Sequence, residues 1–81
     1  MTITVLLFAQ LREALGTDSA VLDVEEGETV RAAVDRLLAR CEDTRLASLP
    51  LSFAVNEEHV GGEHELRDGD RLAVLTPVSG G

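Results

Sequence analysis

Apolar and polar residues alternate along the chain with two different periods, and each change of period marks the border of a predicted element. The first segment, residues 2–8, is rich in β-branched residues and has apolar side chains at every second position: Ile3, Val5 and Leu7. This period predicts a strand. The residues between them, Leu6 and Phe8, are apolar as well, so we expect a central strand, or one whose second face meets a partner.

Two later segments have the period of a helix. Residues 9–15 carry apolar side chains three and four positions apart and are followed by Gly16, which predicts a helix of about two turns. The second helix is expected to begin after Thr29, whose hydroxyl is suited to cap the first turn. One apolar stripe follows, at the spacing of a helix of about three turns: Val30, Val34, Leu37, Leu38 and Cys41.

The remaining apolar runs are short and separated by turn residues. They predict strands at residues 19–24, 51–55, 58–60 and 71–75. Asn56-Glu57 is expected to turn the chain between the second and third of these, and residues 42–50 form a polar loop.

This order of elements predicts an α+β domain of the β-grasp, ubiquitin-like type. A mixed sheet would pack against one main helix, with the first strand beside the last. We expect the β-grasp domain to span residues 1–75 and an extended, flexible tail to span residues 76–81, because Pro77 and the terminal glycines do not suit a strand.

Composition narrows the classes of function. The 81 residues make one domain at most, and a deep catalytic pocket would remove much of its core. Fifteen Asp and Glu against seven Arg and no Lys give a net charge of −8, which disfavours binding to nucleic acid or to an anionic membrane. No apolar run of about 18 residues and no signal-peptide pattern is present, so we expect a cytoplasmic protein.

Few side chains offer nucleophilic chemistry. The candidates are one cysteine and four serines: Cys41, Ser19, Ser48, Ser52 and Ser79. Cys41 ends the apolar stripe, so we expect it to be a small buried residue. The sequence around Ser19 resembles the phosphopantetheine site of acyl carrier proteins, but those proteins are helical bundles. Because Ser19 leads into a strand pattern, we reject that interpretation.

His59 and His64 lie in turn-flanked sequence and are expected at the solvated surface. Four carboxylates surround them: Glu57, Glu58, Glu63 and Glu65. A weak cation site is one interpretation, but clustered carboxylates more often form a solvated face or a docking surface for a basic partner. We therefore predict no metal site.

The chain ends in Gly80 and Gly81. A carboxylate is inert until it is activated, usually as an acyl adenylate, and an enzyme that does this must thread the tail into a narrow channel. Glycines suit such a channel because they lack a Cβ atom. A frayed tail with chance glycines is the alternative, but a Gly-Gly end placed just after the last strand of a β-grasp pattern makes a reactive terminus the stronger interpretation.

These motifs resemble those of the molybdopterin synthase small subunits, within the ubiquitin-like sulfur carriers. The resemblance covers essentially the whole chain and rests on residues 7–13, 54–56, 66–70 and 77–81. The family often has an aromatic residue and a Pro-Pro pair before the tail, where this chain has Leu75 and Thr76.

The resemblance implies a role for the terminus. A ubiquitin-activating-type enzyme would adenylate the Gly81 carboxylate with MgATP, and sulfur from a persulfide donor would displace AMP to leave a thiocarboxylate. The tail would then enter the large synthase subunit, where sulfur passes to cyclic pyranopterin monophosphate. The inserted residues would be Pro77, Val78, Ser79, Gly80 and Gly81. The chain would not be an enzyme on its own and would bind no cofactor, since the catalytic residues belong to the large subunit of an expected heterotetramer.

A partner surface is predicted from the alternation of the strands. If Ile3, Val5 and Leu7 face the helix, then an apolar patch lies on the opposite face: Leu6, Phe8, Ala73 and Leu75. In the alternative, loop 42–50 covers this patch. Three other functions remain open: a sulfur carrier of thiamine or cysteine biosynthesis, a protein modifier joined through Gly81, and a plain interaction domain.

Overall fold

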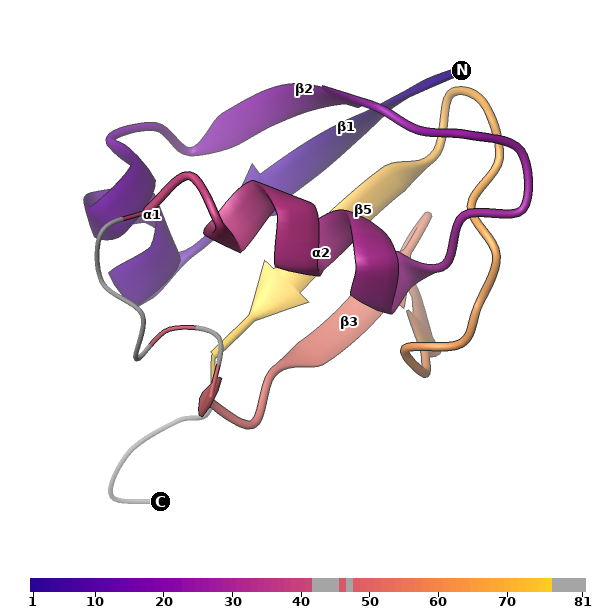
Figure 1. Ribbon diagram of the computed structural model, residues 1–81. Coiled ribbons are helices and arrows are strands. Elements are labelled where there is room, and N and C mark those ends of the chain that lie inside the picture. Colours follow the sequence, from indigo (N-terminus) through magenta and orange to yellow (C-terminus); the bar gives the residue numbers. More distant parts are fainter. Residues whose placement is uncertain (42–45, 47, 77–81) are drawn as a thin grey trace.

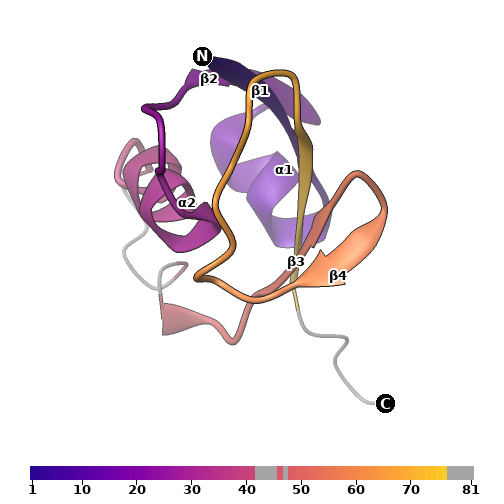
Figure 2. The ribbon, with the colours of Figure 1, turned by 90° about the vertical axis from the view of Figure 1, so that its right-hand side faces the viewer.

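The computed structural model describes residues 1–41, 46 and 48–76 of the chain. The elements follow in the order β1 (Thr2–Leu7), α1 (Ala9–Leu15), β2 (Ser19–Asp23), α2 (Val30–Leu38), β3 (Ser52–Val55), β4 (Glu58–Val60) and β5 (Arg71–Leu75). Within the described residues, five strands form one sheet in the order β2-β1-β5-β3-β4. Figure 1 shows α2 lying across one face of this sheet, and Figure 2 shows the same layers from the side.

The first and last strands lie side by side and run parallel. β1 pairs antiparallel with β2 and parallel with β5, while β5 pairs antiparallel with β3. A parallel pair needs a connection that crosses the sheet, and α2 runs in that connection. The predicted neighbourhood of the first and last strands is therefore confirmed.

The core lies between the sheet and α2. Ile3, Val5 and Leu7 of β1 are buried, and their neighbours in β1 are more exposed, as the period of two predicts. Five residues of α2 are buried on the facing side: Val30, Ala33, Val34, Leu37 and Leu38. Strand and helix periods therefore meet in one apolar layer, which stabilises the packing of α2 on the sheet.

α2 begins where the sequence predicts and ends earlier than the apolar stripe. The Oγ1 atom of Thr29 accepts a hydrogen bond from the backbone nitrogen of Ala32 at 3.2 Å, which is the expected cap. After Leu38 the chain tightens, since the Cys41 nitrogen donates to the Leu38 carbonyl, three residues back, at 2.9 Å. Cys41 therefore lies beyond the helix, half-buried against the core, and its predicted place in the helix is wrong.

α1 joins two antiparallel strands and covers one end of the core. Phe8 is its extended N-cap residue, so β1 ends at Leu7 rather than at Phe8. Leu11 is its buried residue. Gly16 ends the helix with φ 72°, and its nitrogen donates to the Arg12 carbonyl at 2.9 Å. This left-handed conformation favours glycine, as the sequence predicts.

The turn between β3 and β4 is hydrogen-bonded to the turn that precedes β5. Asn56 and Glu57 both have positive φ, 51° and 75°, which gives a hairpin turn whose twist matches that of the strands. The Nδ2 atom of Asn56 donates to Oδ1 of Asp70 at 3.0 Å, and the Arg67 nitrogen donates to Oδ2 of Asp70 at 2.8 Å. The motif residues near 56 and 70 therefore position β3 against β5.

A mixed sheet with one main helix in the crossover between its two parallel strands is the β-grasp architecture, so the predicted α+β fold is confirmed. The predicted strands at 19–24 and 51–55 are each one residue shorter, at Ser19–Asp23 and Ser52–Val55. Among the described residues, no helix has the length and apolar character that crossing a bilayer requires.

Candidate functional site

The predicted interface residues gather on the face of the sheet opposite α2. The pairing of β1 with β5 places Leu6 opposite Ala73, and the pairing of β3 with β5 places Ala54 opposite Ala73. Leu75 lies two residues farther along β5, on the same face. Phe8 follows β1 in extended backbone, so its side chain continues the face of Leu6.

None of these side chains belongs to the core cluster, although all are apolar. Leu6, Ala73 and Leu75 are half-buried by their neighbours in the sheet, while Phe8 is 43% exposed. Val21 of β2 is 68% exposed and pairs with Thr4, next to Leu6. We call this set the outer patch: Leu6, Phe8, Val21, Ala54, Ala73 and Leu75.

Two members of the outer patch were not predicted from the sequence. Val21 and Ala54 both alternate with buried or half-buried residues, which is the signal that could have revealed them. Their place beside Leu6 and Ala73 depends on which strands pair, and residues far apart in the chain supply those strands. Strand order therefore extends the predicted surface onto β2 and β3.

The described leucines of the loop between α2 and β3 do not lie over the outer patch. Leu46 is buried within the core cluster on the α2 side, and Leu49 packs against the same cluster. The alternative in which loop 42–50 covers the patch finds no support from these two residues. Residues 42–45 and 47 of that loop lie outside the described residues.

The predicted tail starts immediately after the strand that carries Ala73 and Leu75. β5 ends at Leu75, and Thr76 is half-buried. The tail residues Pro77, Val78, Ser79, Gly80 and Gly81 lie outside the described residues. The chain thus leaves the sheet beside the outer patch, and Pro77, the first of the predicted tail residues, comes two positions after Leu75.

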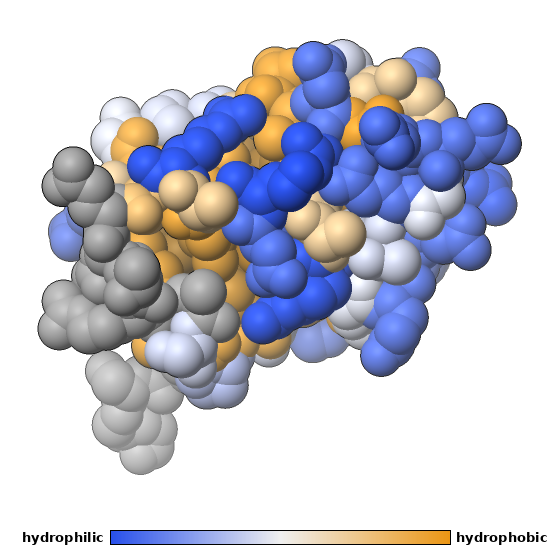
Figure 3. Space-filling view, in the orientation of Figure 1, coloured by the Kyte–Doolittle hydropathy of each residue, from blue (hydrophilic) through white to orange (hydrophobic). Residues whose placement is uncertain are grey.

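Carboxylates gather at the other end of the sheet. Glu26 and Gly27 border two surface hollows at this end: one is completed by the segment at 63–67, and the other by the rest of the turn at 25–28 together with α2. Figure 3, which views the α2 side, shows this end covered by hydrophilic side chains. His59 and His64 are both exposed, and the described residues contain no group of three or more His, Cys, Asp or Glu placed to hold a metal ion.

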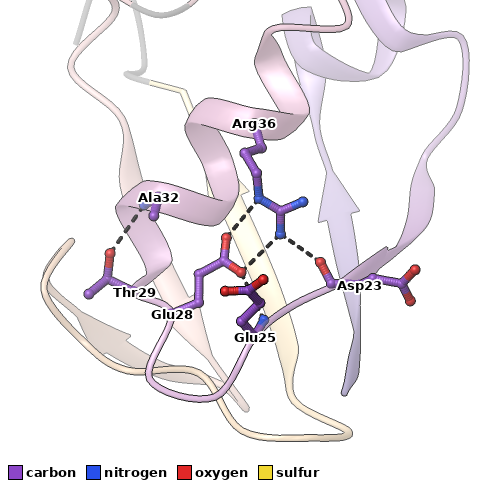
Figure 4. Close-up of polar contacts among 6 residues, drawn as sticks. All are labelled: Asp23, Glu25, Glu28, Thr29, Ala32 and Arg36. Atoms are coloured by element: carbon purple, nitrogen blue, oxygen red, sulfur yellow. Dashed lines mark hydrogen bonds and ion pairs between the residues drawn. The ribbon is translucent and has the colours of Figure 1, made fainter.

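An arginine of α2 is tied to this acidic turn (Figure 4). Arg36 Nε donates to Oε2 of Glu28 at 2.8 Å, and Arg36 Nη2 donates to Oε1 of Glu28 at 3.0 Å. The hydrogen bond from Arg36 lowers the pKa of Glu28 below its ordinary value, and the same bond raises the pKa of Arg36. This bidentate pair has a structural role, since it joins α2 to the turn at residues 25–28, and a further bond from Arg36 Nη2 to the Asp23 carbonyl reaches the end of β2.

The nucleophile candidates among the described residues lie at different places in the fold. Cys41 packs against the core but is half-buried rather than buried as expected, and Ser19 opens β2 rather than a helix. The rejection of an acyl carrier is therefore confirmed by the fold. Ser48 and Ser52 are exposed, and Ser79 lies outside the described residues.

The fold and the outer patch define a protein of the ubiquitin-like β-grasp class. The ThiS family matches residues 5–81, and the chain belongs to this family. A relative from Escherichia coli K12, named molybdopterin synthase sulfur carrier subunit, is 40% identical over 85 residues that cover 98% of this chain and 99% of that one.

Two solved structures extend the comparison. SAMP1 from Haloferax volcanii, a small archaeal modifier protein, covers all of both chains with a TM-score of 0.83 and 27% identity. The structure of a BexX/CysO complex from Amycolatopsis orientalis matches with a TM-score of 0.70 and 32% identity, over 98% of this chain and 99% of that chain. The resemblance stated from the motifs is confirmed at the level of family and fold.

Proposed function

We propose that the chain is the sulfur carrier subunit of a molybdopterin synthase. The observation that carries this proposal is the 40% identity, over nearly the full length of both chains, to the relative of that name from Escherichia coli. On this proposal the chain carries sulfur on its Gly81 carboxylate and delivers it to cyclic pyranopterin monophosphate. It is not an enzyme on its own, and the large subunit supplies the catalytic residues.

The geometry of the described residues suits a carrier. A carrier needs a rigid body, a surface for docking and an accessible reactive end, and it needs no pocket of its own. The outer patch supplies an apolar surface of the kind that partners bury. Because Leu75 belongs to the patch and Thr76 follows it, docking through this surface would bring the start of the tail to the partner.

The proposed chemistry takes place at one carboxylate. MgATP, bound by a ubiquitin-activating-type enzyme, converts the Gly81 carboxylate into an acyl adenylate and releases pyrophosphate. A persulfide then attacks the acyl carbon and AMP leaves. A thiol, itself oxidised to a disulfide, supplies the two electrons that free the thiocarboxylate.

The tail has the proposed task of reaching the large subunit's active site. Pro77 stiffens its start, and Gly80 and Gly81 pass through a narrow channel because they lack side chains. Two sulfur atoms are needed for a dithiolene, so two carriers act in turn and a heterotetramer is the proposed assembly. The chain itself binds no cofactor and no nucleic acid on this proposal, and the reaction takes place in the cytoplasm.

Intact mass spectrometry tests the proposal. The chain is incubated with its activating enzyme, MgATP and a persulfide donor, and the mass is expected to change by the replacement of one oxygen by sulfur. A variant that lacks Gly81 is the matched control and should keep its mass. The large subunit should then form a complex with the chain and convert the precursor to molybdopterin. An unchanged mass of the intact chain, with an activating enzyme shown to be active on another carrier, would refute the proposal.

A protein modifier is the second candidate. It is favoured by the likeness to SAMP1, whose structure covers the whole chain with a TM-score of 0.83. A modifier would appear in the same mass spectra as conjugates in which Gly81 is joined to the lysine side chains of other proteins. Conjugates in the absence of any thiocarboxylate would support this candidate over the carrier.

A further inference from the structure

β2 forms one open edge of the sheet, and the backbone groups of alternate residues in it point away from β1. The Leu7 nitrogen donates to the Asp18 carbonyl at 2.9 Å, and the Val24 nitrogen donates to the Met1 carbonyl at 2.8 Å. The backbone groups of Asp18 and Val24, at the two ends of β2, therefore point to β1. Because this direction alternates along an antiparallel strand, the backbone groups of three residues point to the open edge: Ser19, Val21 and Asp23.

Side chains already bind the outward groups at both ends of this edge. The hydroxyl of Thr17 donates to the Ser19 carbonyl at 2.8 Å and accepts from the Ser19 nitrogen at 3.3 Å. At the other end, Arg36 Nη2 donates to the Asp23 carbonyl at 2.6 Å. Of the three outward carbonyls, only that of Val21 has no hydrogen-bond donor beside it among the described residues.

Arg36 is held in this position by a second contact. Its guanidinium binds both carboxylate oxygens of Glu28, as Figure 4 shows, and Oε1 of Glu28 also accepts from the Glu25 nitrogen at 3.0 Å. A bidentate contact fixes the plane of the guanidinium. The turn before α2 thus directs Nη2 at the end of β2.

We propose that Thr17 and Arg36 block the β2 edge against pairing with a second copy of this chain. The open edge of a sheet is a template for another strand, and proteins protect such edges with charged residues and local hydrogen bonds. The strand that fits this edge is β2 of another copy, antiparallel and centred on Val21, because this pairing closes on itself around a two-fold axis.

In the proposed pairing, Thr17 and Arg36 occupy backbone groups that the second copy would need. In the symmetric dimer the two copies of Val21 would exchange two central hydrogen bonds, and Ser19 of each copy would pair with Asp23 of the other. The Ser19 and Asp23 carbonyls are bound by Thr17 and Arg36, so only the central pair finds open acceptors. The exposed side chains of the two Val21 residues would otherwise add an apolar contact across the axis.

Sedimentation velocity over a range of protein concentrations tests this proposal. The test variant is Thr17→Val with Arg36→Met, which removes the donors and keeps the shape and the aliphatic stem. Arg31→Met is the matched control, because Arg31 lies on the same helix in an exposed ion pair with Asp35 at 3.4 Å and carries the same charge. Salt at 0.15 M, with a Debye length of about 8 Å, limits repulsion between the acidic copies.

We expect the wild type and Arg31→Met to stay monomeric and the double variant to double its mass as its concentration rises. Adding Val21→Lys to the double variant should restore the monomer, because two lysines would face each other at the axis. A folded double variant that remains monomeric, or a dimer that Val21→Lys does not dissociate, would overturn the proposal. So would a wild-type dimer formed through β2.

Thr17→Val alone keeps the test decisive if the double variant fails to fold by circular dichroism. Thr17 is exposed, and its hydroxyl is the acceptor for the Ser19 amide. Hydrogen exchange at that amide should become faster in the variant, while exchange at the Leu22 amide inside the sheet should stay the same. Unchanged exchange at Ser19 would show that Thr17 does not occupy this edge.

Discussion

Asn56 and Asp70 join two turns that are 14 residues apart in the sequence. The Nδ2 atom of Asn56 donates to Oδ1 of Asp70 at 3.0 Å, and Oδ1 of Asn56 accepts from the Arg71 nitrogen at 3.0 Å. Asp70 is only 9% exposed. The Asn56 side chain therefore links the turn of the β3–β4 hairpin to the start of β5, the strand that leads to the tail.

Asp70→Ala is expected to lower the free energy of unfolding by about 1–3 kcal/mol, because it removes a buried carboxylate that accepts hydrogen bonds from the Asn56 amide and from the Arg67 nitrogen. Urea unfolding measures the loss. Asp68→Ala is the matched control in the same turn and should cost less, since its bond to the Thr2 nitrogen is exposed. In a double-mutant cycle with Asn56→Ala, strictly additive losses would show that the two residues are not coupled.

Leu75→Asp is expected to weaken binding to the large subunit by about tenfold or more, because burying a leucine side chain contributes about 1.5–3 kcal/mol. Titration calorimetry measures the affinity. Ala32→Asp is the control, because it places the same charge at an exposed position of α2, on the other side of the sheet, and should have a smaller effect. The melting temperature should hardly change, and a fall of several degrees would place Leu75 in the core instead of the interface.

The Glu28–Arg36 pair predicts a loss of stability in acid. Glu28 has a lowered pKa in the folded protein, so the contribution of the pair is present above the pKa of the unfolded chain and disappears as the pH falls through the folded pKa. Because the Arg36 side chain is half exposed, this contribution should be below about 1 kcal/mol. Denaturant unfolding from neutral to acid pH should show a shallower decline for Glu28→Gln than for the wild type. Equal slopes would contradict the prediction.

Thr29→Ala should destabilise the fold by about 1 kcal/mol, since it removes the acceptor for the Ala32 nitrogen at the start of α2. Thr29→Ser keeps the hydroxyl and should retain most of the stability. Thermal unfolding of the two variants checks this. If both lose the same stability, the methyl group of Thr29 matters rather than its cap.

The elements were predictable because their signals are local. Gly16 ends α1, Thr29 caps α2, and Asn56 with Glu57 turns β3 into β4, each within a few residues of the pattern that predicts it. Cys41 marks the limit of such reasoning. It continues the apolar stripe, but the helix ends at Leu38. An apolar residue at this spacing contacts the core whether the chain there is helical or not, so the stripe alone does not locate the end of the helix.

The candidate site was only partly predictable, for a related reason. Alternation within β1 and β5 placed Leu6, Ala73 and Leu75 on the face away from α2. Val21 and Ala54 join that face only because β2 lies beside β1 and β3 lies beside β5. The blocked edge of β2 could not be predicted, because Arg36 and the Asp23 carbonyl meet through the path of the turn at residues 25–28.

The sequence by itself determined the periods, caps and turns, the acidic charge and the Gly-Gly end, since each depends on neighbours along the chain. The tertiary structure alone decided which strands pair, which side chains share the outer patch and which backbone groups on the β2 edge are occupied. These features depend on contacts between residues far apart in the chain. Local propensity does not specify such contacts, because they form only when the sheet and α2 bury a common core.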